Sequence, residues 1–482
     1  MRKLEGLEPQ RVFYYFEEIC RIPHGSGNTG AMTAYLLEFA GKHGLKSRSD
    51  QAGNVVIYKP ASPGHEESRP VILQGHIDMV AEKEPGSGHD FLRDPLELQV
   101  EGDLISARET TLGGDDGIAV AYCLAVLESS QLVHPPLEAV FTTDEEIGML
   151  GAAALDTSWL SGRTLLNMDS EDEGIFCAGC AGGLTGTSRI PVRYGEASGM
   201  KYSLKISGLK GGHSGICIGE ERINALCMMG RVLHRLREKA EYLLCELFGG
   251  QKDNAIPQEA RAAFLADEAD EEILRETLAL IEKEIRGEYQ GSDGEVTLTL
   301  QKLGAATEPV LHPVSLEKVL FFLVQLPNGV YKRSGVIAGL VETSMNLGIL
   351  RLTPEELVAS GSFRSSVESG KEALAGQVEY LTEFLGGSFQ REGIYPAWEY
   401  REDSPLREIL ISTYRELFGK EPVTEVIHAG LECGIFYGSM PGLDCVSFGP
   451  QMYEIHTARE RLSVSSVERV WRLLVKTLEK LA

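Results

Sequence analysis

Three short apolar runs near the start of the chain each end in a cluster of acidic or histidine side chains. The runs are Pro70–Gln74, Leu137–Thr142 and Thr164–Asn167, and the clusters that follow them read GHID, TDEE and NMDSED. Their continuous apolar character is typical of strands that are buried on both faces of a sheet. In open α/β sheets, sites form beyond the carboxyl ends of the strands. The pattern therefore predicts an α/β fold in which the three clusters share one site.

The remaining patterns of this region agree with an α/β fold. Residues 9–21 and 30–43 carry apolar side chains at helical spacing, Asn54–Tyr58 reads as a further strand, and Gly117–Glu128 reads as a buried helix. Residues 25–30 (GSGNTG) match a dinucleotide-binding fingerprint, but that fingerprint requires a preceding strand. Here it follows a helical segment, so we expect a loop between two helices instead.

Around residue 186 the patterning changes, and it changes back after Tyr400. Between these points we expect a helix over Glu220–Leu247 and, more broadly, two successive α+β units of about 100 residues each. The sequence therefore predicts an α/β domain formed by residues 1–186 and 398–482, which is split by an inserted α+β domain over residues 187–397.

Composition excludes several classes of function. The 482 residues include 46 Lys and Arg against 71 Asp and Glu, which gives a formal net charge of −25. A field of this sign repels nucleic acids and anionic membrane surfaces. No apolar stretch is long enough for a membrane helix, and the N-terminus carries charges where a signal peptide needs apolar residues. With nine scattered cysteines, including Cys177 and Cys180 as small buried residues, we expect a cytoplasmic protein with reduced thiols.

The acidic and histidine clusters together suit a pair of divalent metal ions. Residues of these clusters are His76, Asp78, Asp115, Asp116, Glu145, Glu146, Asp169 and, late in the chain, His456 in the segment MYEIH. His76 and Asp78 project to the same side of a strand end, so Asp78 can hold one imidazole nitrogen while the other binds a metal. Each acidic residue alone could be a helix cap or a solvated loop residue. A carboxylate that bridges two ions, with imidazole and carboxylate completing each shell, favours Zn²⁺, with Mn²⁺ or Co²⁺ as substitutes.

At this point the motifs resemble a known family. GHIDMV, TTLGGDDGIA, TTDEEIGMLGA, NMDSEDEG, KGGHSG and EIHTARERLSV are similar to motifs of the M20 metallopeptidases. HDFLRDPLEL, NAIPQEA, GSFRSS and HAGLECG narrow the resemblance to the aminoacyl-histidine dipeptidases, also called cytosol nonspecific dipeptidases. The resemblance extends from about residue 5 to the C-terminus. It implies a zinc-peptidase-like catalytic domain with a mixed sheet over residues 1–186 and 398–482, and an inserted α+β lid domain of two ferredoxin-like units over residues 187–397.

The resemblance implies roles for individual residues. His76, Asp115 and Asp169 would bind one zinc ion, and Asp115, Glu146 and His456 the other. Glu145 would be the general base, Asp78 would orient His76, and His213 of the lid would stabilise the oxyanion. Arg364 would hold the peptide carboxylate, and Asn254 would make a polar substrate contact. The remaining histidines are read as structural, although His428 lies in the motif HAGLECG.

The implied activity is hydrolysis of unblocked dipeptides, Xaa-His such as β-Ala-His and broader Xaa-Xaa, through a metal-bridging hydroxide. The alternatives are another amide hydrolase of the same scaffold, such as an N-acyl amino acid deacylase or a carboxypeptidase, and a non-catalytic relative that binds metal or peptide. The expected assembly is a monomer or a homodimer. The chain departs from the usual family motif GTTLGADNG at Glu109, Gly114 and Asp116, and Asp116 adds a carboxylate beside the bridging ligand.

Overall fold

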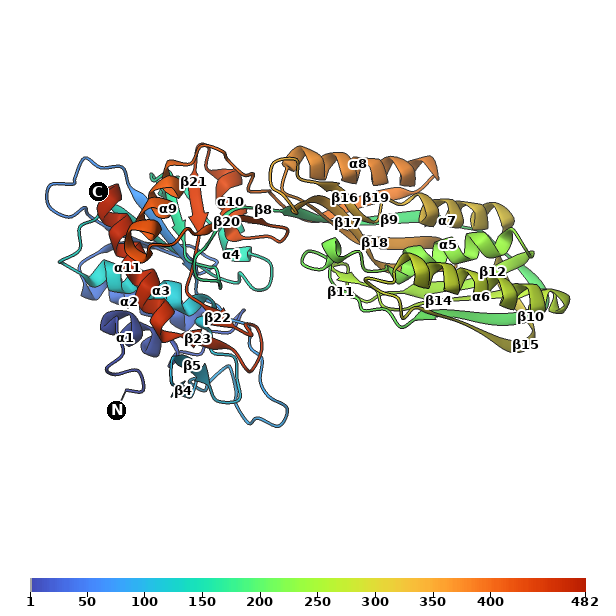
Figure 1. Cartoon of the computed structure of the whole chain (residues 1–482), viewed down its shortest axis with the longest axis horizontal. Coiled ribbons are helices and arrows are strands. Elements are labelled where there is room, and N and C mark those ends of the chain that lie inside the picture. The colour runs from blue at the N-terminus through green and yellow to red at the C-terminus, as the bar shows by residue number, and fades with distance from the viewer. Residues whose placement is uncertain (1) are drawn as a thin grey trace. The chain divides into compact units, whose positions relative to one another are not determined.

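The computed structural model describes residues 2–482, and they form two compact units, each with its own hydrophobic core (Figure 1). The first unit extends through residue 180 and also includes residues 400–426 and 431–482. The second unit comprises Ala181–Glu399 and Ile427–Gly430. The segment Ile427–Gly430 is joined to the rest of the second unit by Ala181, whose backbone N–H donates to the carbonyls of Ile427 and Ala429, at 3.1 and 3.0 Å.

An eight-stranded sheet organises the first unit, in the order β1-β2-β6-β3-β7-β21-β8-β20. Its strands are β1 (Lys46–Ser49), β2 (Val55–Lys59), β3 (Val71–His76), β6 (Leu137–Thr142), β7 (Thr164–Asn167), β8 (Ile175–Cys180), β20 (Val423–Ile427) and β21 (Asp444–Ser447). β3 runs parallel to both β6 and β7, so the carboxyl ends of these three strands meet at one edge. These are the three predicted strands that carry the acidic and histidine clusters.

The first unit contains several α-helices, which include the predicted helical segments 9–21, 30–43 and 117–128. They are α1 (Gln10–Ile19), α2 (Gly30–Lys42), α3 (Gly114–Glu128), α4 (Leu150–Ala154), α9 (Pro405–Phe418), α10 (Glu432–Ser439) and α11 (Val464–Leu481). α3 is buried from Gly114 to Leu127 and packs against α1 and β3, which confirms the predicted buried helix. GSGNTG lies between α1 and α2, as predicted. Among residues 2–482, no helix has the length and apolar character needed to span a bilayer.

A smaller antiparallel sheet also belongs to the first unit. It contains β4 (Leu98–Glu101), β5 (Leu104–Ala107), β22 (Met452–Tyr453) and β23 (Arg461–Ser463), in the order β22-β23-β5-β4. The connection between β22 and β23 carries His456. The segment MYEIH is therefore not a strand that ends at its histidine, since only its first two residues pair and His456 itself has a positive φ of 60°.

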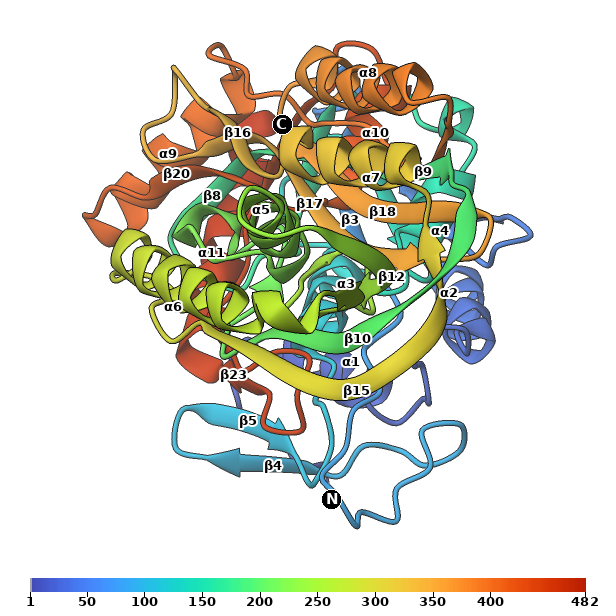
Figure 2. The ribbon, with the colours of Figure 1, turned by 90° about the vertical axis from the view of Figure 1, so that its right-hand side faces the viewer.

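The second unit is built on a nine-stranded antiparallel sheet whose main path is β15-β10-β14-β12-β17-β18-β9-β19. The strands are β9 (Gly182–Pro191), β10 (Tyr194–Ser207), β12 (Tyr242–Gly249), β14 (Ala260–Ala266), β15 (Thr297–Leu311), β17 (Val341–Leu352), β18 (Glu356–Ser365) and β19 (Ser388–Tyr395), with β16 (Gly329–Arg333) paired to β17. Its helices are α5 (Ala225–Arg237), α6 (Glu271–Glu288), α7 (Pro313–Gln325) and α8 (Glu368–Phe384), and α5 and α7 lie between α6 and α8 (Figure 2).

This sheet consists of two halves with the same βαββαβ connectivity. One half is β10–α5–β12–β14–α6–β15, and the other is β9–α7–β17–β18–α8–β19. These two halves are nested, whereas the sequence predicts two successive α+β units. The first half is inserted between β9 and α7 of the second half. A short pairing joins them, with Phe248 opposite Arg351 and Gly249 opposite Leu350.

One expected helix of this unit is wrong. The sequence predicts a single helix over Glu220–Leu247, whereas α5 ends at Arg237 and the chain continues into β12. Apolar residues lie on both sides of the charged run at residues 237–241 (REKAE), but their period changes across it, and the alternate residues Tyr242 and Leu244 are buried as strand spacing requires. β12 is the strand that completes the βαββαβ connectivity of the first half.

Candidate metal centre

His76 is the last residue of β3, and its imidazole points toward carboxylates from other segments. Nε2 of His76 lies 3.1 Å from Oδ1 of Asp115 and 3.6 Å from Oδ1 of Asp169, which follows β7. On its other side, Nδ1 lies 3.0 Å from the carbonyl oxygen of Asp78 and 3.4 Å from the Oδ1 atom of that residue. The second imidazole nitrogen is thus held by Asp78, which leaves Nε2 free for a metal.

Asp115, in the first turn of α3, lies between two imidazoles. While its Oδ1 faces His76, its Oδ2 lies 3.1 Å from Nε2 of His456. Nε2 of His456 also lies 3.0 Å from Oε1 of Glu146, which comes from the loop after β6. One carboxylate with an oxygen toward each of two histidines is the arrangement that a bridging ligand between two cations requires.

The clustered ligand atoms fall into overlapping groups that could each hold a cation. Within each group the atoms lie no more than 4.8 Å apart, and the groups are Asp115 with Glu146 and His456, His76 with Asp116 and Asp169, and His76 with Glu145 and Glu146. Asp116 is fully buried, and its Oδ2 accepts the backbone N–H of His76 at 3.1 Å. Asp116, one of the departures from the family motif, therefore lies against the same histidine as the predicted ligands.

Electrostatics show that this cluster requires positive charge. Hydrogen bonds to Asp115 and Glu146 raise the pKa of His456 to about 11. Burial and neighbouring carboxylates raise the pKa of Asp169 to about 7 and that of Glu145 to about 9. Divalent cations relieve this repulsion and favour the ionised carboxylates. The nitrogen and oxygen donor set, without thiolate, fits Zn²⁺, Mn²⁺ or Co²⁺.

Two groups that support the centre were not identified from the sequence. Ser26 of GSGNTG donates its hydroxyl to Oδ2 of Asp78 at 2.7 Å, so the apparent nucleotide fingerprint contributes to the metal centre. Glu432, fully buried at the start of α10, accepts from Gln74 at 2.5 Å and from Thr142 at 2.6 Å. Ser26 lies in a loop and Glu432 more than 280 residues from Thr142, so periodicity gives no signal for either contact.

Comparisons with known proteins identify the family. The sequence pattern of peptidase family M20/M25/M40 matches residues 72–480, which contain every predicted metal ligand. The chain belongs to the M20 peptidase family. It is 37% identical to the cytosol non-specific dipeptidase of Escherichia coli (strain K12), over 100% of this chain and 99% of that protein. The family is metal-dependent, and the chain carries a candidate metal site.

Solved structures of M20 peptidases share the fold. The crystal structure of aminoacylhistidine dipeptidase from Vibrio alginolyticus matches with a TM-score of 0.93 at 35% identity, covering 99% of this chain and 98% of that one. Aminopeptidase PepT from Bacillus cereus matches with a TM-score of 0.55 at 15% identity, covering 98% of this chain and 99% of the other. The second likeness concerns the fold alone.

The second unit brings its predicted site residues together at one place. His213 pairs with Ala255 in a two-stranded ladder, and the backbone N–H of Ser214 donates to the carbonyl of Asn254 at 2.9 Å. Arg364 of β18 lies opposite Ser344 of β17. Burial and the charge of Arg364 lower the pKa of His213, so this imidazole is neutral at neutral pH.

His428, which the sequence predicts to be structural, joins this cluster. Its Nε2 lies 2.7 Å from the hydroxyl oxygen of Ser344. Gly215 lies close to both histidines. A Cβ at this position would lie 2.8 Å from the carbonyl oxygen of His428 and 3.0 Å from Cε1 of His213. Burial and Arg364 lower the pKa of His428 to about 3. Both imidazoles of the cluster are therefore neutral hydrogen-bonding groups.

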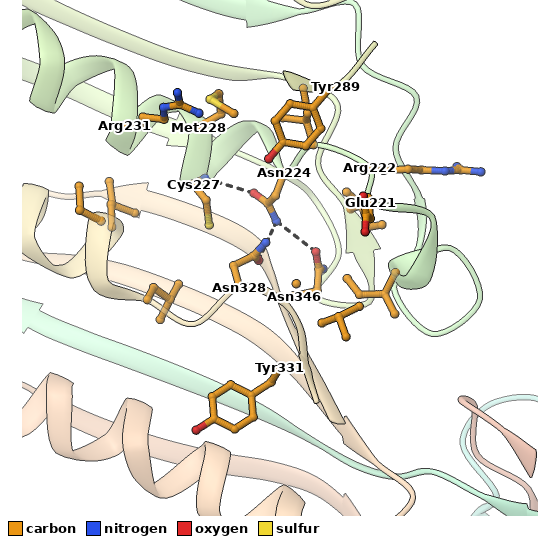
Figure 3. A pocket seen from close by; sticks show the side chains of 18 of the residues that line it. Glu221, Arg222, Asn224, Cys227, Met228, Arg231, Tyr289, Asn328, Tyr331 and Asn346 are labelled. Atoms are coloured by element: carbon orange, nitrogen blue, oxygen red, sulfur yellow. Dashed lines mark hydrogen bonds between the residues drawn. The ribbon is translucent and has the colours of Figure 1, made fainter. Parts of the chain in front are cut away.

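A separate cavity of about 970 Å³ lies within the second unit and contains none of the predicted site residues (Figure 3). Asn224 forms its polar floor, with Nδ2 donating to Oδ1 of Asn328 at 3.2 Å and to Oδ1 of Asn346 at 3.1 Å. Arg231, one of the arginines that line it, makes two 2.6 Å contacts to the carboxylate of Glu288. These polar side chains of the lining thus bond to one another. The cavity is not part of the candidate metal centre.

Proposed function

We propose that the chain is a dipeptidase that hydrolyses unblocked dipeptides with two zinc ions per chain. The observation that carries this proposal is the position of Asp115, whose two oxygens each lie 3.1 Å from a different imidazole, those of His76 and His456. Asp169 lies beside the imidazole of His76, and Glu146 lies beside that of His456. The dipeptidase name of the Escherichia coli relative, at 37% identity over the full chain, supports the substrate class.

The chain's own residues would divide the chemistry. His76, Asp115, Asp169, Glu146 and His456 would hold divalent cations, which would supply Lewis-acid activation of water and of the scissile carbonyl. Glu145 would accept the proton of the attacking water and return it to the leaving amine. Its backbone is fixed for this role, because its N–H donates to Oδ1 of Asp78 at 3.0 Å. Asp78 thereby orients both the base and His76.

The second unit would supply the groups that bind substrate. His213, as a neutral imidazole, would donate an N–H to the developing oxyanion. Arg364 would pair with the carboxylate of the dipeptide, since its Nε has no hydrogen-bond partner among residues 2–482 although the side chain is buried. Asn254 would make a polar contact to the peptide. A free carboxylate held in this way also limits the length of substrate.

A substrate comparison on metal-analysed protein tests the proposal. The panel contains free dipeptides, including β-Ala-His and other Xaa-His and Xaa-Xaa, together with N-acetylated amino acids and longer peptides. We expect hydrolysis of the free dipeptides with two zinc ions per chain, and little turnover of the acetylated compounds. Preferred turnover of N-acyl amino acids would instead identify a deacylase. Protein that binds metal but hydrolyses none of them would be a non-catalytic relative.

The proposal includes the cell compartment that the sequence predicts. None of the nine cysteines, all within residues 2–482, forms a disulfide, and the Escherichia coli relative is named a cytosol non-specific dipeptidase. Reduced thiols are typical of the cytoplasm.

A further inference from the structure

Glu460 is a buried carboxylate that no step of the proposed mechanism uses. It lies four residues after His456, in the connection between β22 and β23, and its side chain is only 3% exposed. A buried carboxylate is costly unless hydrogen bonds compensate it. The partners of this side chain therefore indicate what it is for.

Four consecutive backbone N–H groups donate to Glu460. Oε2 accepts from Leu112 at 2.8 Å and from Gly113 at 3.1 Å, and Oε1 accepts from Gly114 at 2.7 Å and from Asp115 at 3.3 Å. These residues lead into α3, whose N-cap residue, Gly113, offers no side chain of its own. Glu460 thus caps this helix from a remote segment of the chain.

The two segments that Glu460 joins each carry a predicted metal ligand. One segment ends at Asp115 and the other begins at His456, and their side chains meet at 3.1 Å. The His456 segment is fixed internally, since the hydroxyl of Thr457 donates to the carbonyl of Glu454 at 2.7 Å and Arg461 donates to the Glu454 carboxylate at 2.8 Å. Glu460 is joined to this segment, because its backbone N–H donates to the carbonyl of Thr457 at 3.1 Å, so a shift of Glu460 would carry His456 with it.

The close approach of Glu460 depends on a glycine. A Cβ at Gly114 would lie 3.1 Å from Oε1 of Glu460 and 3.2 Å from Sδ of Met452. Both contacts are tighter than ordinary packing. Gly114 therefore lets the carboxylate reach the two N–H groups nearest the bridging ligand.

We infer that Glu460 is a positioning residue of the metal centre, which sets the separation of Asp115 and His456 so that both can bind one cation. This inference rests on the proposed metal centre. It predicts that Glu460 determines metal affinity to an extent that its effect on fold stability does not explain. Residues that orient metal ligands typically change affinity by about 10–100-fold.

Glu460→Gln tests this inference, with Glu138→Gln as the matched control. The glutamine keeps the shape but presents an NH₂ group, which cannot accept from the two N–H groups on its side. Glu138 is likewise buried, at 5% exposure, and accepts from the backbone N–H groups of Ser161 and Gly162, both at 3.0 Å. Glu138 belongs to the same unit as Glu460, but the turn to which it bonds carries no predicted metal ligand.

The measurements are zinc affinity, by competition with a chromophoric chelator on folded protein, and the thermal midpoint of the zinc-free protein. We expect both variants to lose thermal stability, and only Glu460→Gln to lose zinc affinity, by about 10–100-fold. Glu460→Asp, which keeps the charge on a shorter side chain, should fall between wild type and Glu460→Gln, and it serves if the glutamine variant does not fold.

Three results would overturn the inference. Wild-type zinc affinity in both Glu460 variants would show that the carboxylate is only a helix cap. An equal loss of affinity in Glu138→Gln would show that affinity follows general stability. Wild-type protein that binds no zinc would overturn the proposed function itself, and it is distinguished from the other two because the chelator titration of the unaltered chain fails.

Discussion

Oδ1 of Asp78 accepts a hydrogen bond from the backbone N–H of Glu145, with 3.0 Å between the two atoms. The same carboxylate faces Nδ1 of His76 at 3.4 Å and accepts from the hydroxyl of Ser26 at 2.7 Å. Asp78 thus connects a predicted metal ligand with the proposed general base. Substitution of this one residue should affect both metal binding and catalysis.

Asp78→Asn is predicted to weaken zinc binding by about 10–100-fold, because an amide cannot hold the imidazole of His76 as a carboxylate does. Activity at saturating zinc should still be reduced, since the loop of Glu145 loses a charged acceptor. Chelator competition gives the affinity, and kcat at saturating metal gives the second effect. Asp156→Asn is the control, because Asp156 accepts the backbone N–H of Ser158 at 3.0 Å beside a short helix that carries no predicted ligand. Wild-type kcat in Asp78→Asn at saturating zinc would show that Asp78 does not position the base.

The neighbouring glutamates Glu145 and Glu146 are predicted to have different roles. Oε1 of Glu146 lies 3.0 Å from Nε2 of His456. Within residues 2–482, Glu145 forms no ion pair with His456. Glu145→Gln should therefore keep two metals per chain and lose about 10²–10⁴-fold in kcat, as removal of a general base does. Glu146→Gln should lower metal occupancy as well. Near wild-type turnover in Glu145→Gln would remove Glu145 from the mechanism.

Much of the first unit follows from sequence patterns alone. β3, β6 and β7 are continuous apolar runs with polar ends, and helix α9 begins with a proline and ends before Gly419, which are strong local signals. The metal centre could be proposed because its ligands follow these strands. The position of His456 could not, because it depends on pairing between β22 and β23, and these strands have two and three residues.

The second unit was less predictable because its organisation depends on long-range pairing. β9 pairs with β18 and β19, more than 160 residues later, and no local pattern shows that β10 to β15 are inserted between β9 and α7. Apolar residues on both sides of the charged run at residues 237–241 concealed the change from α5 to β12. Contacts such as those of Glu460 and Ser26 likewise come from remote segments of ordinary composition.

The first unit should fold and bind metal when the second unit is removed. Entry and exit of the inserted segment are adjacent, since a Cβ at Gly182 would lie 2.4 Å from the backbone nitrogen of Ala397. Replacement of residues 182–399 by a short Gly-Ser linker should therefore give a soluble, zinc-binding and inactive protein. Circular dichroism, zinc analysis and a dipeptide assay measure these properties. An insoluble product without zinc would contradict independent folding.

His213 is predicted to serve the metal centre of its own chain. The second half of the nine-stranded sheet pairs with β12 through Phe248 and Gly249, and so provides within one chain the half-sheet that a partner could otherwise add. Mixing of His213→Ala with Glu145→Gln tests this. If a partner supplied His213, about half of random dimers would be heterodimers with one intact site, so about a quarter of wild-type activity would return.

We expect no recovery in this mixture. Subunit exchange must be followed separately, for example with two differently labelled chains, so that absence of recovery is informative. A return of activity toward a quarter of wild type would show that His213 acts in the partner's site.

The most direct test of the account is anomalous diffraction from crystals of the zinc-loaded protein, measured on both sides of the zinc absorption edge. The account predicts two anomalous peaks in the first unit, one on each side of the Asp115 carboxylate. The first should contact His76 and Asp169, and the second should contact Glu146 and His456. A single peak, or peaks that Asp115 does not touch, would contradict a bridged two-metal centre.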